Sequence, residues 1–418
     1  MWRLGFFFHE MAFGLLSVFI PLYVIGFSDV AVLGGPLVAL GIMMSVAMFC
    51  SIPASFLWGW LCDATRRCKP FILMSFASSA VLLFIMTLPF AKNVIVFVML
   101  YVIMQFLHIA HEAPKNVLIA EHYSRDDWEM SYSYYRLSTE FGLIIGLAIG
   151  FCLSVGLFSF AANLSSAILA TYTLYFCSGL SIVAFILSAL LVTDPLLIFE
   201  RRLVRIERAV DFTCRSVASA SRVLGGSYWY KSPKQASFKL FALAIVLFSL
   251  ATSIFFTPLP VFLSQGLGLH SSMAYIGSIF TSIGATAGYF FISGRARSMD
   301  SGKQMSRCVL FRSLLIFSLI GIIQLAIFPS VLTFLVLVFL GFSFAIYYIL
   351  MISVSMELIP AGKSGLFDGL VGLGTAFGSF LGPYLASAYN YVPTYFIAAL
   401  LFFLAFLTIK FATSDTSS

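Results

Sequence analysis

Charged side chains are scarce in this sequence. Asp, Glu, Lys and Arg together make up 10% of its 418 residues, whereas hydrophobic residues make up 61%. A typical soluble domain carries about 25% charged residues. A soluble protein of this length would have too few charges to cover its surface, so the composition excludes a soluble fold.

Signatures of several kinds of catalysis are also missing. No phosphate-binding loop of the form Gly-x-x-x-x-Gly-Lys-Ser/Thr is present, which argues against ATP-driven pumping. The apolar segments contain neither paired metal ligands nor a nucleophile beside a base. Cys62 and Cys68 flank a short loop without further ligands. We therefore expect no enzyme, no metal site and no cofactor, and we expect the seven cysteines to be free thiols.

Long apolar segments dominate the chain instead. Each is about 20 residues long, enough to cross the ~30 Å hydrocarbon layer as a helix that satisfies its own backbone hydrogen bonds. The sequence thus predicts an all-α membrane protein with twelve transmembrane helices, six on each side of a polar linker. The predicted spans are 4–27, 35–60, 70–90, 93–117, 133–155, 168–192, 237–263, 273–293, 308–328, 330–355, 365–387 and 391–411.

Lys and Arg residues indicate how these helices are oriented. If the N-terminus is cytoplasmic, the loops on the other side of the membrane contain only Lys92. Such a bias predicts a multi-pass protein of the plasma membrane with both termini in the cytoplasm. The net charge of +7 then reflects topology, so we expect no nucleic-acid partner. Besides the linker cluster, the predicted cytoplasmic positions are Arg66, Arg67, Lys69, Lys115, Arg125, Arg295, Arg297, Lys303, Arg307 and Lys363.

The chain contains an internal repeat. The segment Phe19-Ile20-Pro21-Leu22 returns 237 residues later as Phe256-Thr257-Pro258-Leu259. Gly142 and Gly146 return 236 residues later as Gly378 and Gly382, and Gly150 and Gly374 extend the four-residue spacing in their own helices. Small residues at this spacing favour close helix packing. We predict two pseudo-symmetric six-helix bundles, 1–193 and 237–418, with a substrate site between them.

The linker, 194–236, combines apolar residues at helical spacing with six arginines between 201 and 222. A basic amphipathic helix of this kind is suited to the cytoplasmic surface of the bilayer, with its arginines at anionic headgroups. The linker is therefore interpreted as a membrane anchor that joins the halves, and a partner-binding helix is the alternative.

One loop carries a family resemblance. Between the second and third spans, Gly59, Leu61, Asp63, Arg67 and Lys69 match a loop signature, and the pattern resembles that of the major facilitator superfamily. Ala64, Arg66 and Cys68 depart from it. The resemblance implies the fold of that family and a cytoplasmic gate at this loop, in which Asp63 faces the N-terminus of the eleventh helix. There, Asp368 would face Arg66 or Arg67. A plain solvated turn is the alternative.

Ionisable residues inside the spans are the candidates for coupling, because each costs about 2.5 kcal/mol or more at the bilayer centre. Glu10, Glu112, Arg136 and Glu140 all fall in the cytoplasmic half of their helices. The resemblance implies that the first, fourth and fifth helices are neighbours. Three carboxylates around one arginine cannot all be compensated, so at least one should bind a proton, with Glu10 the first choice.

Each of these residues also has a simpler interpretation. Arg136 and Glu140 are four residues apart and would form an intrahelical ion pair. Glu112 would lie at the membrane interface. His108 is a candidate proton site, but it also fits a hydrogen-bonded core histidine.

The second half has no acid from Phe241 to Met356, and we place Arg312 at a helix start. Neutral polar and aromatic side chains would therefore line the cavity. The candidates are Gln105, Ser249, Thr252, Ser253, Tyr347 and Tyr348.

Together these features predict a proton-coupled secondary active transporter that moves a small organic solute by alternating access. Efflux of an amphipathic neutral or cationic compound is favoured, because the acids face only one deep base and the cavity is mostly apolar. Proton symport or facilitated uptake stays open, since the fifth span lacks the Gly-Pro pair of family antiporters. A membrane sensor or scaffold without transport is a third interpretation. We expect a monomer whose partners are the solute, protons and lipid.

Overall fold

The computed structural model describes residues 2–65, 67–122, 128–156, 166–194, 233–293, 301–325, 329–358 and 364–414. At some positions within these ranges, Asp63 and Asp368 among them, only the backbone is described. Every regular element in the described residues is helical. The predicted linker lies outside the described residues, except for Asp194 and the first turn of the helix that follows.

The first half contributes six spans to the fold. Short 3₁₀ turns occur where the chain reverses or a helix changes pitch. In chain order the elements are α1 (Arg3–Val24), η1 (Val30–Leu33), α2 (Pro36–Thr65), α3 (Lys69–Ile85), η2 (Pro89–Lys92), α4 (Val94–His108), η3 (Ile109–His111), α5 (Glu112–His122), α6 (Trp128–Val155) and α7 (Ser166–Leu191).

The second half repeats this arrangement. Its elements are α9 (Pro233–Phe256), α10 (Leu259–Val261), η5 (Phe262–Gly266), α11 (Ser272–Ser293), α12 (Ser301–Leu325), α13 (Pro329–Leu358), α14 (Ser364–Tyr389) and α15 (Tyr391–Ser414). In the described residues, eleven helical segments are long and apolar enough to cross a membrane. The shorter α3, with 17 residues, corresponds to the third predicted span and brings the total to twelve. The predicted all-α membrane fold is confirmed.

Two of the predicted spans are interrupted. The fourth is divided into α4, η3 and α5, so that the helix changes pitch at Ile109–His111. The seventh breaks after Phe256, where Pro258 and Pro260 lack the N–H groups that would continue it. Pro21, by contrast, lies inside α1, which continues to Val24.

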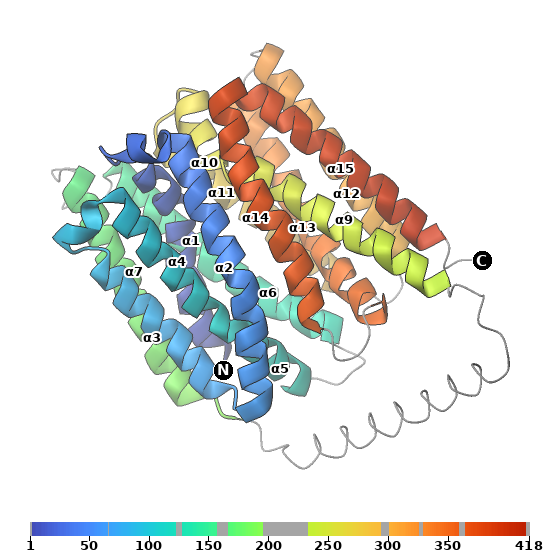
Figure 1. Cartoon of the computed structure of the whole chain (residues 1–418), viewed down its shortest axis with the longest axis horizontal. Helices are drawn as coiled ribbons and strands as arrows, with labels where there is room; N and C mark the ends of the chain where they lie inside the picture. The colour runs from blue at the N-terminus through green and yellow to red at the C-terminus, as the bar shows by residue number, and fades with distance from the viewer. Residues whose placement is uncertain are drawn as a thin grey trace.

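The two halves lie side by side, with α1–α7 in blue to green and α9–α15 in yellow to red (Figure 1). They meet where α2 packs along α14 and α6 along α11. Phe49 and Phe377 contact each other edge to face at the first of these seams, with ring centroids 5.2 Å apart. Near the end of α1, Val24 shares a buried cluster with Val261 of α10. The halves therefore touch along two long seams and at one end.

Glycines allow the first and fifth helices of each half to approach closely. A Cβ atom at Gly142 or Gly146 of α6 would overlap the backbone oxygen of Phe7 or Met11 in α1. The glycines of α14 meet backbone oxygens of α9 in the same way, and these are Gly374, Gly378 and Gly382. The sequence repeat thus corresponds to a repeated helix contact.

We predict that Gly146→Ala destabilises the protein by about 1–3 kcal/mol, as overpacking of an interior typically does. The reason is the overlap of the new methyl group with α1. Gly179→Ala is the matched control, because a Cβ atom at Gly179 meets nothing within 4 Å. Thermal unfolding of the two purified variants measures the difference. Equal melting temperatures would show that the α1–α6 contact tolerates a larger separation.

Candidate functional site

Three helical segments of the first half bring the predicted acids and Arg136 together. Glu10 of α1 is close enough to Arg136 of α6 to be attracted by it and close enough to Glu112 of α5 to be repelled. Glu140, one turn after Arg136, interacts with both Arg136 and Glu10. The four residues therefore belong to one electrostatic network inside the membrane-spanning part of the protein.

Lys115 adds a second base to this network. Its side chain is only 2% exposed, and Nζ donates a hydrogen bond to the Glu112 carboxylate. His111 Nε2 lies 3.3 Å from the other oxygen of Glu112, whose side chain is 42% exposed. Our placement of Lys115 in a loop is wrong, because Lys115 lies within α5, which continues to His122, and its side chain is buried.

Three imidazoles lie beside this pair. His9 Nε2 and His108 Nδ1 are 3.1 Å apart. The ring of His9 stacks on Phe76, and the ring of His108 stacks on Phe13. The structure therefore places His108 in the hydrogen-bonded core position that the sequence offered as the alternative to a proton site.

Each of these imidazoles has one nitrogen within 4.8 Å of a nitrogen of the other two. In the described part of the chain, this three-histidine group is compact enough to hold a metal ion. Their hydrogen bonds favour another role. His111 Nδ1 is 2.6 Å from the carbonyl oxygen of His108, so it must carry a proton. Because His111 Nε2 faces Glu112, this ring directs no lone pair toward the other two histidines. We assign the three to a hydrogen-bond network.

Arg136 connects the two halves. Its Nη2 donates to the hydroxyl of Tyr348 in α13 at 2.9 Å, and its guanidinium lies 4.9 Å from the centroid of the Tyr348 ring. Tyr132, one turn earlier in α6, places its hydroxyl 3.4 Å from the same tyrosine oxygen. Arg136 and Tyr348 were predicted for different roles, as coupling and cavity residues, but they are in direct contact.

Glu140 also reaches the other half, because its carboxyl group lies close to the side chain of Ser282 in α11, which packs along α6. No ion pair within 4.0 Å joins Glu140 to Arg136 in the described part of the chain. The intrahelical ion pair considered from the sequence is thus replaced by a longer-range interaction and a contact across the seam. Ser282 gave no sequence signal, because it is one of many serines in apolar helices.

Arg312 occupies a different position from the one predicted. The helix α12 begins at Ser301 rather than near residue 308, so Arg312 lies in its middle and is fully buried. Nη1 donates to the carbonyl oxygen of Leu340 at 2.7 Å. The second half therefore contains a deep base, contrary to our expectation.

The remaining cavity candidates are dispersed. Gln105 donates to the hydroxyl of Tyr101 within the first half. Ser249 and Ser253 pack against Gly374 and Gly378, between α9 and α14. Tyr347 stacks on Phe248 with ring centroids 3.6 Å apart. Thr252 has a buried hydroxyl without a hydrogen-bond partner.

The predicted gate lies largely outside the described side chains, since Asp63, Arg66 and Asp368 are not described at that level. Arg67 is exposed, and no described contact crowds Gly59. Lys69 Nζ donates to the carbonyl oxygen of Ala189 at the end of α7. The carboxylate of Asp194 accepts hydrogen bonds from the backbone N–H groups of Cys68 and Lys69, which caps the N-terminus of α3.

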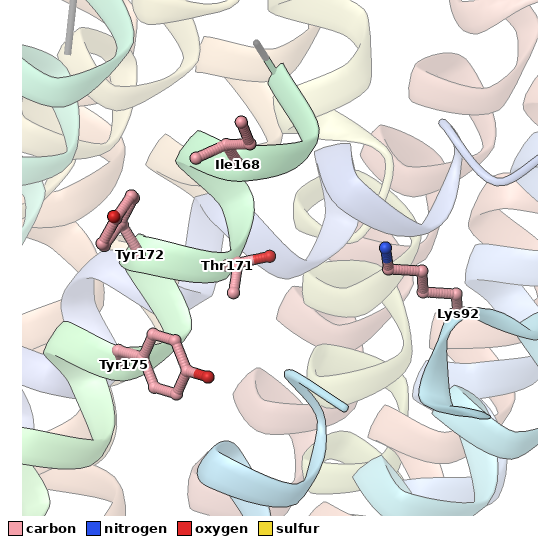
Figure 2. Close-up of a pocket in the computed structure, with 5 residues that line it drawn as sticks. All are labelled: Lys92, Ile168, Thr171, Tyr172 and Tyr175. Atoms are coloured by element: carbon pink, nitrogen blue, oxygen red, sulfur yellow. The ribbon is translucent and has the colours of Figure 1, made fainter. Parts of the chain in front are cut away.

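A surface pocket lies away from this network. It is lined by Lys92 and by four residues along α7, Ile168, Thr171, Tyr172 and Tyr175 (Figure 2). None of the predicted site residues contributes to it, so we assign no role in transport to this pocket.

A known protein family matches most of the chain. The sequence model of the Major Facilitator Superfamily matches residues 4–371. No curated protein matches the chain.

Solved structures resemble it over almost the full length. The xylose transporter XylE from E. coli, in a partially occluded inward-open conformation, is 14% identical with a TM-score of 0.66, covering 97% of each chain. A D-xylose–proton symporter is 16% identical with a TM-score of 0.69, covering 97% of this chain and 96% of that one. A point mutant of the nucleoside transporter NupG is 14% identical with a TM-score of 0.70, covering 99% of this chain and 98% of that one.

We predict that Glu112→Ala destabilises the protein by about 2 kcal/mol, because it leaves the buried Lys115 ammonium without its carboxylate. The loss is smaller than the about 3–5 kcal/mol for fully buried pairs, since Glu112 is partly exposed. The double variant Glu112→Ala/Lys115→Met should recover much of this loss. Thermal unfolding in detergent measures both, with Lys92→Met, at an exposed lysine, as the control. A double variant no more stable than Glu112→Ala would contradict the pairing.

Proposed function

The chain belongs to the major facilitator superfamily, and on this premise we propose that it is a proton-coupled secondary transporter of a small organic solute. The single observation that supports this proposal is the network of Glu10, Glu112, Lys115, Arg136 and Glu140, because it links acids on the membrane-spanning helices of one half to polar groups of the other.

Charge balance gives the network a reason to bind a proton. Three carboxylates face two permanent cations, Lys115 and Arg136, so one negative charge is uncompensated unless His111 or a carboxylate holds a further proton. An uncompensated charge in an apolar interior is costly, and a proton on one carboxylate removes it. Glu10 was the first choice from the sequence. Glu140 has the stronger case in the fold, because its side chain lies close to Ser282 of the other half, at the seam between α6 and α11.

Coupling follows if this contact changes with protonation. A carboxylate only accepts hydrogen bonds, whereas a protonated carboxyl also donates. The Glu140–Ser282 and Arg136–Tyr348 contacts both join α6 to the second half, so both would rearrange when the halves rock. We propose that proton binding at Glu140 sets which arrangement is stable. The halves 1–193 and 237–418 would move as the two bodies, with Asp63, Arg66, Arg67, Lys69 and Asp368 closing the cytoplasmic side.

The argument for a neutral or cationic solute no longer holds. It depended on a single deep base, and the structure contains three, Lys115, Arg136 and Arg312. Efflux remains the direction favoured by the sequence, and uptake by symport is the second candidate. The likeness to a D-xylose–proton symporter supports the second. We propose further that the protein is a monomer of the plasma membrane with cytoplasmic termini, and that the linker 194–236 contacts anionic lipids.

The test is transport by the full-length protein in liposomes that contain a pH-sensitive dye. The solutes are D-xylose, uridine, 5-aminolevulinic acid and phenylacetate, each added under a pH gradient. We expect at least one to drive proton movement in the wild type. In Glu140→Gln this movement should fall at least tenfold while exchange of labelled solute continues, because the solute pathway is intact. The sign of the proton movement relative to solute flow distinguishes symport from antiport.

Asp29→Asn is the control, since Asp29 accepts a hydrogen bond from the backbone of Val94 and lies outside the network. Glu10→Gln and Glu112→Gln show whether the other acids contribute. Proton coupling through this network would be wrong if all three glutamine variants kept the wild-type response. A wild type that moves none of the solutes, yet binds a cytoplasmic partner, would favour the sensor interpretation.

A further inference from the structure

Arg312 is held inside the second half by aromatic rings. Its side chain is fully buried, and the guanidinium carbon lies 5.1–5.8 Å from four ring centroids. These rings belong to α9, α13 and α15, so the residue is enclosed among three helices besides its own. They are Phe248, Phe256, Phe344 and Phe402. Cation–π attraction to these rings offsets part of the free-energy cost of burying the charge.

The hydrogen bonding of Arg312 is incomplete. Nη1 donates to Leu340, but Nε and Nη2 are buried and have no partner. These two nitrogens form one edge of the planar guanidinium, where two N–H bonds point in parallel. That edge matches the two oxygens of a carboxylate, which it binds in bidentate fashion. The unpaired Nε–Nη2 edge therefore has the geometry to bind a carboxylate.

In the second half, the sequence places every acid far from the helix turns that surround Arg312. These acids are Asp300, Glu357, Asp368 and Asp415, whose side chains are not described. By position they lie at helix ends: Asp300 precedes α12, and Glu357 is the penultimate residue of α13. Asp368 precedes Gly369, which faces Phe56 of α2. Arg312, twelve residues into α12, lies deep in the bundle.

Thr252 provides an independent second observation. Its hydroxyl oxygen is buried without a hydrogen-bond partner. It lies on α9 one turn from Phe248 and one turn from Phe256, both of which face Arg312. Residues at this spacing share one face of a helix. An unpaired hydroxyl thus lies on the same helix face as two of the phenylalanines that surround the guanidinium group.

A chain of rings leads from Arg312 to the seam between the halves. Phe344 lies over Arg312 and also stacks on Tyr348, one turn further along α13, with centroids 5.7 Å apart. Tyr348 in turn accepts the hydrogen bond from Arg136. One ring, Phe344, therefore separates the enclosed guanidinium from the residues that join the two halves.

We propose that the Nε–Nη2 edge of Arg312, with the hydroxyl of Thr252, binds the carboxylate of an organic solute. Phe248 and Phe344 contact the apolar body of that solute, and Phe344 moves aside when it enters from the seam. The aromatic surroundings supply no second cation, which selects a monocarboxylate over a phosphate dianion. This proposal rests on the transport function and names its substrate class as amphipathic monocarboxylates.

Binding to the purified full-length protein in detergent tests the proposal without any proton gradient. Phenylacetate and hexanoate are the carboxylate probes, phenylacetamide and phenethylamine are the neutral and cationic counterparts, and inorganic phosphate is the dianion. We expect the carboxylates alone to raise the melting temperature of the wild type. Arg312→Lys keeps the charge but loses the paired donors, so phenylacetate affinity should fall at least tenfold. Arg307→Lys, at an exposed arginine of the same helix, should bind as the wild type does.

Thr252→Val, which keeps the side-chain shape and removes the hydroxyl, is the second variant and should weaken binding severalfold even if Arg312→Lys does not fold. The proposal is overturned if neither carboxylate binds the wild type, if phenylacetamide or phosphate binds equally well, or if both variants bind phenylacetate with unchanged affinity. Glu140→Gln should still bind phenylacetate. Failure of proton coupling and failure of carboxylate binding are therefore distinguishable.

Discussion

A charge buried in a helix bundle that lipid surrounds must be compensated by another group of the protein, because neither water nor lipid can do so. Lys115, Arg136 and Arg312 each satisfy this constraint in a different way. Lys115 is paired with the carboxylate of Glu112. Arg136 donates a hydrogen bond to a tyrosine hydroxyl and is attracted by several nearby acids. Arg312 contacts aromatic faces and donates to one carbonyl oxygen. The position of each base determines which helices must pack together around it.

The two halves share a scaffold but compensate charge differently. The glycine contacts of α6 with α1 recur between α14 and α9, so the backbone framework is repeated. The first half places acids around its bases, whereas the second places phenylalanines around Arg312. Acids respond to protons and aromatic surroundings do not. We therefore propose that the first half carries the coupling and that the second half recognises the solute.

The spans and the glycine contacts could be predicted because their signals are local: apolar length for the helices, and four-residue spacing for the glycines. Lys115 and Arg312 were misplaced for the same reason that the spans were found. Hydropathy places span ends near residues 117 and 308, where polar residues begin, but α5 continues to His122 and α12 already begins at Ser301, in a polar segment. Apolar length alone therefore places a basic residue near a span end at the surface, even when the helix continues and buries it.

Contacts between the halves leave no trace in a single sequence. Arg136 and Tyr348 are 212 residues apart, and neither residue type specifies the other as a partner. Only the fold reveals that α6 carries both Arg136 and Glu140 to the second half, on two successive turns. Because α6 belongs to the bundle that holds the acids, the proposed change in their protonation would act directly on the seam between the halves. A chain with the same acids on α3 or α7, which pack mainly against helices of their own half, would lack this link.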